Sequence, residues 1–292
     1  MATASTALTR RSFIAASALA SATVLGLLAG CGENDSQTGD DASASSASTN
    51  APADAASADD ATSLGLITPG TLTVGSDCDY PPFIWMDGEQ PCGFEYDLMT
   101  EVCNRMGLEL KYLPPQKFDT LVPSLVTGGK MDVAVSSVTI TDARLEEIDF
   151  TEPYCDSNQS IAIMKDSAIE SRDDLAGKTV AVHSGTTGEE WAKENLVDST
   201  IVPYDDQSSA FAALAAGKAD AFCEDLPIAQ YMIANAYPDC VLLEEVPTGE
   251  QYAIAVSQEN PALTDAISEA LQSIVDDGTY DDLYDAYFMA EA

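Results

Sequence analysis

The sequence is poor in basic residues and in histidine, and both shortages exclude kinds of function. It has 12 Lys and Arg against 49 Asp and Glu, which gives a formal net charge of −37. Nucleic acid is therefore excluded as a partner, because binding to phosphates depends on clustered basic side chains. His183 is the single histidine and no Cys-x-x-Cys pair is present, so the usual zinc sites are excluded. We expect no metal and no cofactor.

Long apolar runs are also scarce, and the one that stands out lies at the N-terminus. Arg10 and Arg11 precede an apolar run over residues 14–29 that is too short and too rich in small residues for a membrane span. The arginine pair resembles a twin-arginine export signal, and Leu28-Ala29-Gly30-Cys31 resembles a lipobox in which Cys31 becomes the acylated first residue. The sequence predicts a signal peptide over residues 1–30 and a lipid-anchored protein outside the cytoplasm.

The segment after Cys31 has a composition that is typical of a linker. Residues 33–62 contain no Lys, Arg or aromatic residue and consist mostly of Ala, Ser, Asp, Thr and Gly. Such a segment cannot bury enough apolar surface to offset the entropy of ordering. We predict a disordered linker over residues 31–63. The remaining chain exceeds one average domain and suits two lobes.

Six further cysteines follow the predicted lipidation site. Their number is even and the predicted compartment is oxidising, so the sequence permits disulfides without choosing a pairing. They are Cys78, Cys92, Cys103, Cys155, Cys223 and Cys240.

From residue 71 onward, short apolar segments alternate with helical patterns, which predicts an α/β fold. In the first half we expect strands over 71–75 and 133–136 and helices over 95–106 and 118–127. In the second half we expect strands over 179–182, 201–203 and 219–223 and helices over 188–195 and 208–216. A strand over 252–256 and helices within 261–288, broken at Gly278, close the chain.

Open α/β sheets bind ligands beyond the carboxyl ends of their strands, so the candidate site residues are those that follow predicted strands. The first such loop is Asp77-Cys78-Asp79-Tyr80-Pro81-Pro82-Phe83, with prolines that stiffen it and aromatic rings that offer flat apolar walls. The next is Ser136-Ser137-Val138-Thr139, followed by Arg144. The planar guanidinium of Arg144 suits a carboxylate, because it donates two parallel charge-assisted hydrogen bonds.

Two segments of the second half complete the candidate set. His183-Ser184-Gly185-Thr186-Thr187-Gly188 joins a predicted strand to a helix and so offers backbone N–H groups to an anion, without the lysine of a phosphate-binding loop. Asp225 follows the strand over 219–223 and suits a ligand ammonium, a role compatible with capping the next helix. We expect its neighbour Glu224 to be a solvated charge. Cationic and anionic groups together favour a zwitterionic ligand.

Four motifs resemble the family 3 extracellular solute-binding proteins, the polar amino-acid receptors of ABC importers. The resemblance covers about Leu66 to Met289 and rests on the following runs. They are Gly93-Phe94-Glu95-Tyr96-Asp97-Leu98, Ser136 to Thr141 with Arg144, Asp149-Phe150-Thr151-x-Pro153-Tyr154, and Asp276-Asp277-Gly278-Thr279-Tyr280.

The resemblance implies a periplasmic-binding-protein type II fold, with two lobes, two hinge segments and a ligand cleft between the lobes. It places lobe 1 at residues 66–156 plus 253–292 and lobe 2 at 157–252. It also implies a monomer that delivers its ligand to a membrane permease and ATPase.

The resemblance implies a role for each candidate residue. Arg144 and the N–H groups of Thr139 and Thr187 would hold the ligand carboxylate. The Ser137 carbonyl, the Thr139 hydroxyl and Asp225 would hold the ammonium. Tyr80, Phe83 and Phe118 would pack the side chain, Asp77 would read its polar group, and His183 lies at a position that varies with specificity. Gly188 departs from relatives that carry a polar side chain there.

The type II scaffold also hosts enzymes, such as dehydratases of prephenate-like acids. The sequence shows no second catalytic domain and no nucleophile–histidine–acid set except around His183. We therefore predict a binding protein and not an enzyme. A sensor that delivers ligand to a receptor is equally compatible with the sequence.

The charge around the predicted site favours certain ligands. With Asp225 and Arg144 assigned to the zwitterion, Asp77, Asp79 and Glu224 remain, and His183 is the one possible cation. Such a surround repels a second carboxylate, so we expect a basic or amide side chain on the ligand. A neutral polar ligand such as cystine stays possible if Asp79 faces solvent.

Overall fold

The structure is a computed structural model that describes residues 64–289. The predicted signal peptide, the lipidation site Cys31 and the linker over 31–63 lie outside the described residues. No helix within 64–289 has the length and apolar character needed to cross a membrane.

The first lobe is built on a five-stranded sheet. β1 (Thr71–Gly75) lies between β5 (Glu109–Tyr112) and β6 (Val133–Ala134) and runs parallel to both. β13 (Ala255–Ser257) joins antiparallel between β6 and β7 (Ile148–Phe150), which gives the order β5-β1-β6-β13-β7. The C-terminal part of the chain thus contributes β13 to a sheet whose other four strands come from residues 71–150.

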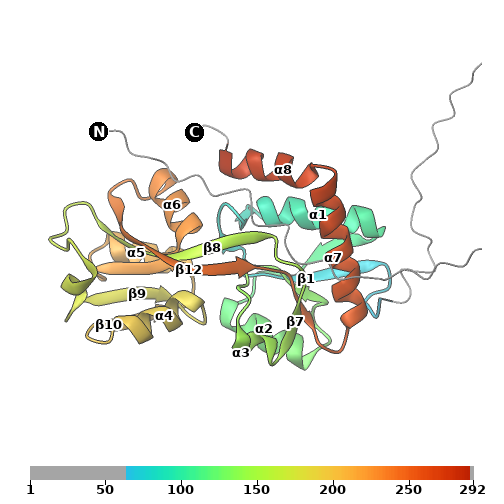
Figure 1. The fold of residues 1–292 in the computed structure, drawn as a ribbon, viewed down its shortest axis with the longest axis horizontal. Coiled ribbons are helices and arrows are strands. Elements are labelled where there is room, and N and C mark those ends of the chain that lie inside the picture. The colour runs from blue at the N-terminus through green and yellow to red at the C-terminus, as the bar shows by residue number, and fades with distance from the viewer. Residues whose placement is uncertain (1–63, 290–292) are drawn as a thin grey trace, which may run out of the picture. The chain divides into compact units, whose positions relative to one another are not determined.

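Helices cover this sheet and bury its apolar side chains. α1 (Phe94–Met106), α7 (Pro261–Asp276) and α8 (Thr279–Tyr284) pack against one another (Figure 1). α2 (Leu121–Thr127) covers another part of the sheet, and its core contains Leu121, Leu125, Met131, Ala134, Val138, Ile148 and Ala255. Short helical turns are η1 (Phe118–Thr120), α3 (Asp142–Leu145) and the terminal π-helical turn η3 (Asp285–Met289).

A small antiparallel sheet stands beside α1, formed by β2 (Asp79–Tyr80), β3 (Ile84–Asp87) and β4 (Gln90–Cys92). Gly93 connects it to α1 with a φ of 121°. A Cβ at this position would lie 2.4 Å from the carbonyl oxygen of Phe83. Only glycine fits here, which is the physical reason for the glycine that opens the 93–98 motif.

The second lobe is built on a sheet with the order β10-β9-β11-β8-β12. Its strands are β8 (Cys155–Met164), β9 (Thr179–His183), β10 (Thr200–Tyr204), β11 (Ala221–Asp225) and β12 (Cys240–Tyr252). Its helices are η2 (Arg172–Leu175), α4 (Thr187–Asn195), α5 (Gln207–Ala215) and α6 (Leu226–Asn235). Ile161, Val180, Val182 and Cys223 are among its fully buried core residues.

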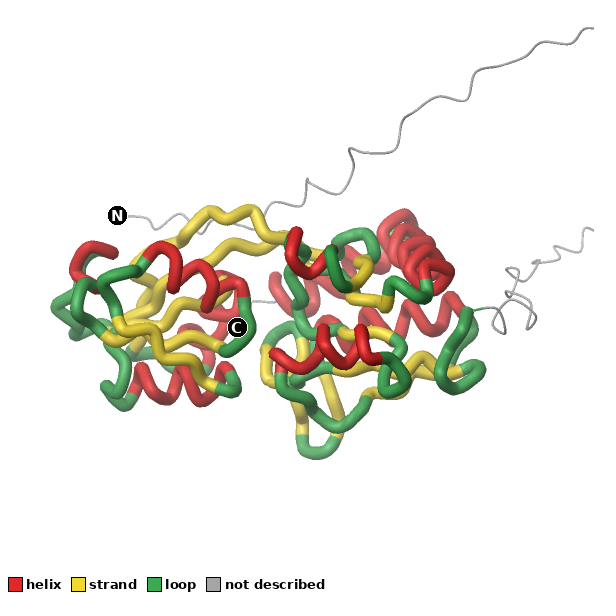
Figure 2. Tube along the Cα trace, turned by 90° about the horizontal axis from the view of Figure 1, so that it is seen from below, coloured by secondary structure: helices red, strands yellow, loops and turns green. Residues whose placement is uncertain are grey.

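The chain crosses between the lobes twice, along β8 and back along β12. These strands pair antiparallel until Cys155 faces Tyr252. Figure 2 shows them side by side between the two groups of helices and strands. Backbone hydrogen bonds continue past the pairing, from Tyr154 N–H to the Tyr252 carbonyl at 2.9 Å and from Thr151 N–H to the Ile254 carbonyl at 3.0 Å. The crossing is therefore a double, hydrogen-bonded connection.

The predicted two-lobed α/β architecture is confirmed, with corrections to the elements. The strand expected over 133–136 ends at Ala134, where the backbone turns toward Ser137 with a φ of 49°. The strand expected over 252–256 is instead the end of β12 and the separate β13. The strand expected over 219–223 starts two residues later and includes Asp225. The helix expected after Asp225 is α6, whose bounds were not predicted, and the sequence reading missed the full lengths of β8 and β12.

The six cysteines of the described part are free thiols, five of them buried and Cys92 partly exposed. We therefore expect the fold to be independent of disulfides, so a strong reductant should leave the melting temperature unchanged. In a Cys31→Ser background, a thiol reagent should label Cys92 quickly and the other five only after denaturation. Mass spectrometry counts the labels, and a large loss of stability on reduction would contradict this prediction.

Candidate functional site

Asp77 lies just beyond the carboxyl end of β1 and is tied to the end of the neighbouring strand. The Ser136 hydroxyl donates to Asp77 Oδ1 at 2.7 Å and accepts from the Asp77 N–H at 3.1 Å. Burial raises the pKa of Asp77, and the charge of His183 from the second lobe opposes that rise. Asp77 Oδ2 is buried without a hydrogen-bond partner among the described residues.

Ser137 is held by Glu95, a residue of the 93–98 motif that the sequence reading did not place in the site. Both the N–H and the hydroxyl of Ser137 donate to Glu95 Oε1 at 2.8 Å, and the Tyr154 hydroxyl donates to the same oxygen at 2.6 Å. Burial raises the pKa of Glu95 to about 7. These bonds fix the positive φ of Ser137 and so orient the chain toward Thr139.

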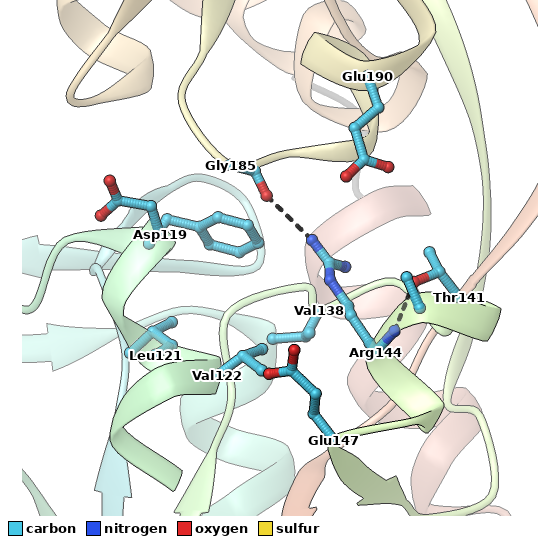
Figure 3. Close-up of a pocket in the computed structure, with 11 residues that line it drawn as sticks. Asp119, Leu121, Val122, Val138, Thr141, Arg144, Glu147, Gly185 and Glu190 are labelled. Atoms are coloured by element: carbon cyan, nitrogen blue, oxygen red, sulfur yellow. Dashed lines mark hydrogen bonds between the residues drawn. The ribbon is translucent and has the colours of Figure 1, made fainter. Parts of the chain in front are cut away.

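Arg144 lies in α3, whose capping residue Thr141 accepts from the Arg144 N–H at 3.2 Å. Its guanidinium donates to the Thr139 carbonyl at 2.7 Å and, across the lobes, to the Gly185 carbonyl at 3.1 Å. Figure 3 shows the side chain reaching from α3 to the loop that carries Gly185. Burial lowers the pKa of Arg144, an effect opposed first by the charge of Glu190.

Phe118 forms an aromatic wall beside this guanidinium. Its ring centroid is 5.6 Å from the Arg144 Cζ and 5.5 Å from the His183 ring centroid. Arg144 and Phe118 also line a pocket of about 190 Å³ that draws on both lobes (Figure 3). The remaining lining residues are Asp119, Leu121, Val122, Val138, Thr141, Ala143, Glu147, Gly185 and Glu190. The other eight predicted ligand residues do not line this pocket.

Asp225 ends β11 and is buried against the crossing strands. Its carboxylate accepts from Gln159 Nε2 at 2.5 Å and from the Tyr252 hydroxyl. Burial raises the pKa of Asp225 to about 7, and the charge of Glu250 adds to the rise. The Asp225 side chain makes no capping bond to α6, so the predicted capping role is wrong for this side chain.

Gln159 and Glu250, from β8 and β12, are site residues that the sequence reading missed. Glu250 Oε2 accepts from Gln159 Nε2 at 3.0 Å and from the Thr187 hydroxyl at 2.9 Å. A Cβ at Gly188 would lie 2.9 Å from Gln159 Oε1. Gln159 thus occupies the space that a larger residue at position 188 would need. No signal in the sequence marked these residues, since they stand within strands and not after them.

Tyr80 connects the lobes through Glu224. Its hydroxyl donates to Glu224 Oε1 at 2.5 Å, and the same oxygen accepts from the Asp225 N–H at 2.8 Å. Glu224 is 2% exposed, so the expectation of a solvated charge is wrong. Burial, followed by the charge of Asp225, raises the pKa of Glu224 well above its usual range.

Asp79 and Phe83 occupy other positions than the sequence suggested. The Asp79 carboxylate accepts from the N–H and hydroxyl of Ser208, at 2.9 and 2.5 Å, at the start of α5. It is therefore committed to the second lobe and does not simply face solvent. Phe83 is fully buried, with its ring centroid 5.0 Å from that of Phe288 and 5.3 Å from that of Tyr252. Its ring belongs to an aromatic core beneath the Tyr80 loop.

The strand ends of the two lobes thus bring a guanidinium, hydroxyl-rich backbone and buried carboxylates together. None of the ion pairs within residues 64–289 includes Asp77, Glu224, Asp225 or Glu250. A site with an unpaired guanidinium on one side and unpaired carboxylates on the other suits a small molecule that carries both charges. The fold and the site define a two-lobed binding protein for small polar solutes.

Comparison with known proteins identifies the family. Residues 72–290 match the bacterial extracellular solute-binding proteins, family 3, and the chain belongs to that family. It is 31% identical to the L-cystine-binding protein TcyJ of Escherichia coli (strain K12) over 225 residues, 76% of this chain and 84% of that protein. It is 30% identical to the ABC transporter arginine-binding protein 1 of Escherichia coli (strain K12), over 74% of this chain and 90% of that protein.

Solved structures agree with the type II fold. A mutant of ArgBP from T. maritima superposes with a TM-score of 0.71 and 38% identity, covering 75% of this chain and 96% of that chain. An ancestral amino acid-binding protein, a precursor of cyclohexadienyl dehydratase, has a TM-score of 0.70 and 36% identity, covering 75% of this chain and 96% of that chain. The periplasmic-binding-protein type II fold expected from the sequence is confirmed, and the similar proteins are chiefly amino-acid-binding proteins.

The buried carboxyl groups predict an unusual dependence of stability on pH. Burial raises the pKa of Glu95 from 4.5 and of Asp225 from 3.8, each to about 7. Between the unfolded and folded pKa values the native state holds protons that the unfolded state has released, so stability falls as pH rises through that window. We expect the melting temperature to drop by several degrees from about pH 5 to about pH 8, given about 1.4 kcal/mol per pKa unit.

Calorimetric scans across this range on the wild type, Glu95→Gln and Asp225→Asn isolate the two groups from the many surface carboxylates. In each variant the melting temperature should fall less between about pH 5 and about pH 8, because the substituted side chain has no carboxyl proton to release. A wild-type melting temperature that rises over the same range, or equal slopes in all three proteins, would contradict the prediction.

Proposed function

We propose that the protein captures an L-amino acid with a polar, basic or amide side chain outside the cytoplasm and delivers it to an ABC importer. The observation that carries the proposal is the placement of Arg144 and Asp225. Arg144 reaches from the first lobe to the Gly185 loop, and Asp225 is a buried carboxylate of the second lobe. Opposite charges at two fixed points match the two charged groups of an α-amino acid.

The carboxylate of the ligand would bind at the first of these points. Arg144 has five N–H donors in a planar fork, and the carbonyls of Thr139 and Gly185 accept from its two terminal nitrogens. In the proposed complex the guanidinium and the N–H groups of Thr139 and Thr187 hold the ligand carboxylate. Lobe closure would strengthen these bonds by excluding water.

The ammonium of the ligand would bind at the second point. Gln159 and Tyr252 hold the Asp225 carboxylate in one orientation, and burial makes an unpaired charge there costly. An ammonium supplies the missing counter-charge. The Ser137 carbonyl and the Thr139 hydroxyl would accept its remaining hydrogens, with Ser137 positioned by Glu95.

We further propose the cellular setting implied by the sequence and the family. The segment 1–30 directs export, Cys31 carries a lipid anchor, and the linker over 31–63 tethers a monomer near a membrane permease and ATPase. The lobes, 66–156 with 253–292 and 157–252, close about the crossing strands. Labelled palmitate should be incorporated by the wild type and not by Cys31→Ser.

A dehydratase-type enzyme and a sensor component are the rival functions. Structural similarity to an enzyme precursor keeps the first open. The arrangement supports binding instead, because the candidate acid Glu224 is hydrogen bonded to Tyr80 and to backbone rather than set beside a nucleophile. Incubation with candidate acids, followed by product analysis, separates an enzyme from a binding protein.

A thermal-shift screen against the standard amino acids, followed by calorimetry on Arg144 variants, tests the proposed function. A ligand that binds only the folded state raises the melting temperature. Arg144→Ala should lower affinity by about thirty-fold to several thousand-fold, because truncating one member of a buried charge pair costs roughly 2–5 kcal/mol. The affinity of Arg144→Lys should fall between those of the wild type and Arg144→Ala, since lysine keeps the charge and loses the planar fork. Wild-type affinity in a folded Arg144→Ala protein would disprove the site assignment.

The side chain of the ligand should be a hydrogen-bond donor. Asp77 is buried beyond β1, and no Lys or Arg pairs with it among the described residues. Like charges 4 Å apart cost roughly 4 kcal/mol at an effective dielectric of about 20, so glutamate and aspartate should bind poorly. Arginine, lysine, histidine or glutamine should bind better, and cystine, whose far end carries an ammonium and a carboxylate together, is the neutral polar alternative.

Competition binding at neutral pH, with Asp77→Asn beside the wild type, checks this preference. The variant should weaken a basic ligand by about tenfold or more, equivalent to about 1.4 kcal/mol, and affect glutamine less. Tight binding of glutamate by the wild type would refute the assignment of a donor side chain. So would a basic ligand whose affinity is unchanged by Asp77→Asn.

A further inference from the structure

Three buried side chains at the facing strand ends each carry a polar atom without a hydrogen-bond partner among residues 64–289. They are Asp77 Oδ2 from the first lobe, and His183 Nδ1 and Glu224 Oε2 from the second. The side chains are 9, 1 and 2% exposed. Buried polar atoms are nearly always hydrogen bonded, and an exception calls for a specific explanation. Nine such atoms occur among the described residues, and these three lie where the strand ends of the two lobes face each other.

The three groups are close enough to act on one another. The charge of His183 lowers the pKa of Asp77, and the charge of Asp77 raises that of Glu224. They come from different elements, namely the loop after β1, the end of β9 and the strand β11. The fold therefore gathers them at one place between the lobes, where the His183 ring centroid also lies 5.5 Å from that of Phe118.

Glu224 is held in a fixed orientation. Its Oε1 accepts from the Tyr80 hydroxyl across the lobes at 2.5 Å and from the Asp225 N–H at 2.8 Å. Two donors on one oxygen restrict rotation of the carboxyl group and fix the position of Oε2. A cation beside Oε2 would oppose the rise in the pKa of Glu224 that burial causes, and Oε2 would then accept from it. Tyr80 is itself 5% exposed. Its hydroxyl is therefore better suited to position Glu224 than to contact solvent.

The chemistry of these acceptors defines what they would bind. Asp77 and Glu224 are carboxyl groups, and no Lys or Arg forms an ion pair with either in the described part of the chain. A carboxylate on a ligand would be repelled, and a neutral amide would leave one carboxylate uncompensated. A guanidinium or ammonium supplies both the charge and several N–H donors.

We propose that Glu224, positioned by Tyr80, is a specificity-determining residue that binds the cationic end of the ligand side chain opposite Asp77. The inference rests on the proposed function, in which Arg144 and Asp225 bind the two α-groups of an amino acid. The family resemblance already implies that Asp77 binds the polar group of the ligand side chain. The second carboxylate, from the other lobe, makes recognition of a cation depend on lobe closure.

The test compares arginine with citrulline, which replaces the guanidinium by a neutral group of nearly the same shape. Calorimetry is done on the full chain as wild type, Glu224→Gln and Tyr80→Phe, with lysine as a second cationic probe. The wild type should bind arginine or lysine at least about tenfold more tightly than citrulline. Glu224→Gln should reduce that preference by about tenfold or more, with citrulline affinity within about threefold of the wild type.

Tyr80→Phe keeps the ring and removes the donor, so it should reduce the preference in the same direction but by less. It also keeps the inference testable if Glu224→Gln does not fold. Glu259→Gln is the charge-matched control, since Glu259 is exposed in the turn after β13. Its preference for arginine over citrulline should equal that of the wild type.

The outcomes separate this inference from the proposed function. Binding of no amino acid by the wild type overturns the proposed function and this inference with it. Amino-acid binding that is sensitive to Arg144→Ala, but with no preference for cationic side chains, overturns this inference alone. It is also overturned if Glu224→Gln weakens arginine and citrulline equally, which would show a purely structural role for Glu224.

Discussion

The double crossing of the chain between the lobes is the constraint on which the rest of the structure depends. β13 lies between β6 and β7 of the first sheet, yet it follows the whole second lobe in sequence. The first sheet is therefore complete only when the chain has returned along β12. The pairing of β8 with β12 also fixes Gln159 and Tyr252 where they can hold Asp225. Connection of the lobes and orientation of the site are one structural feature.

Buried carboxyl groups give the site its character and lower the stability of the free protein. Glu95 and Asp225 are bound by hydroxyl, amide and backbone donors and have no cationic partner among the described residues. Neutral donors compensate a buried charge only in part. A fold selected for stability alone would replace such groups with apolar residues of similar volume. In the proposed function, a ligand ammonium would supply the charge that Asp225 lacks, and Glu95 would serve recognition by positioning Ser137.

Sequence reasoning succeeded where strand ends determine position and failed where a residue lies within a strand. Asp77 follows an apolar strand and Arg144 follows the segment 136–139, so the rule that ligands bind beyond strand ends was enough to predict that both lie there. Gln159 and Glu250 lie inside β8 and β12, whose mixed polar composition and partial exposure resemble loops. Glu224 was misread because it lies in β11, which is buried along its whole length, and because its partner Tyr80 is 144 positions away in sequence.

In the proposed function, recognition of the ligand and closure of the lobes would use the same side chains. Arg144 already donates to Gly185 across the lobes, and Tyr80 donates to Glu224. Each of these bonds favours a closed arrangement before any ligand contributes. A ligand shifts such an equilibrium only by the difference in its affinity for the two arrangements. If Asp77 and Glu224 bind the ligand side chain as proposed, part of that difference would come from two atoms without a hydrogen-bond partner among the described residues, Asp77 Oδ2 and Glu224 Oε2. The atoms that choose the ligand would then also be the atoms through which it holds the lobes together.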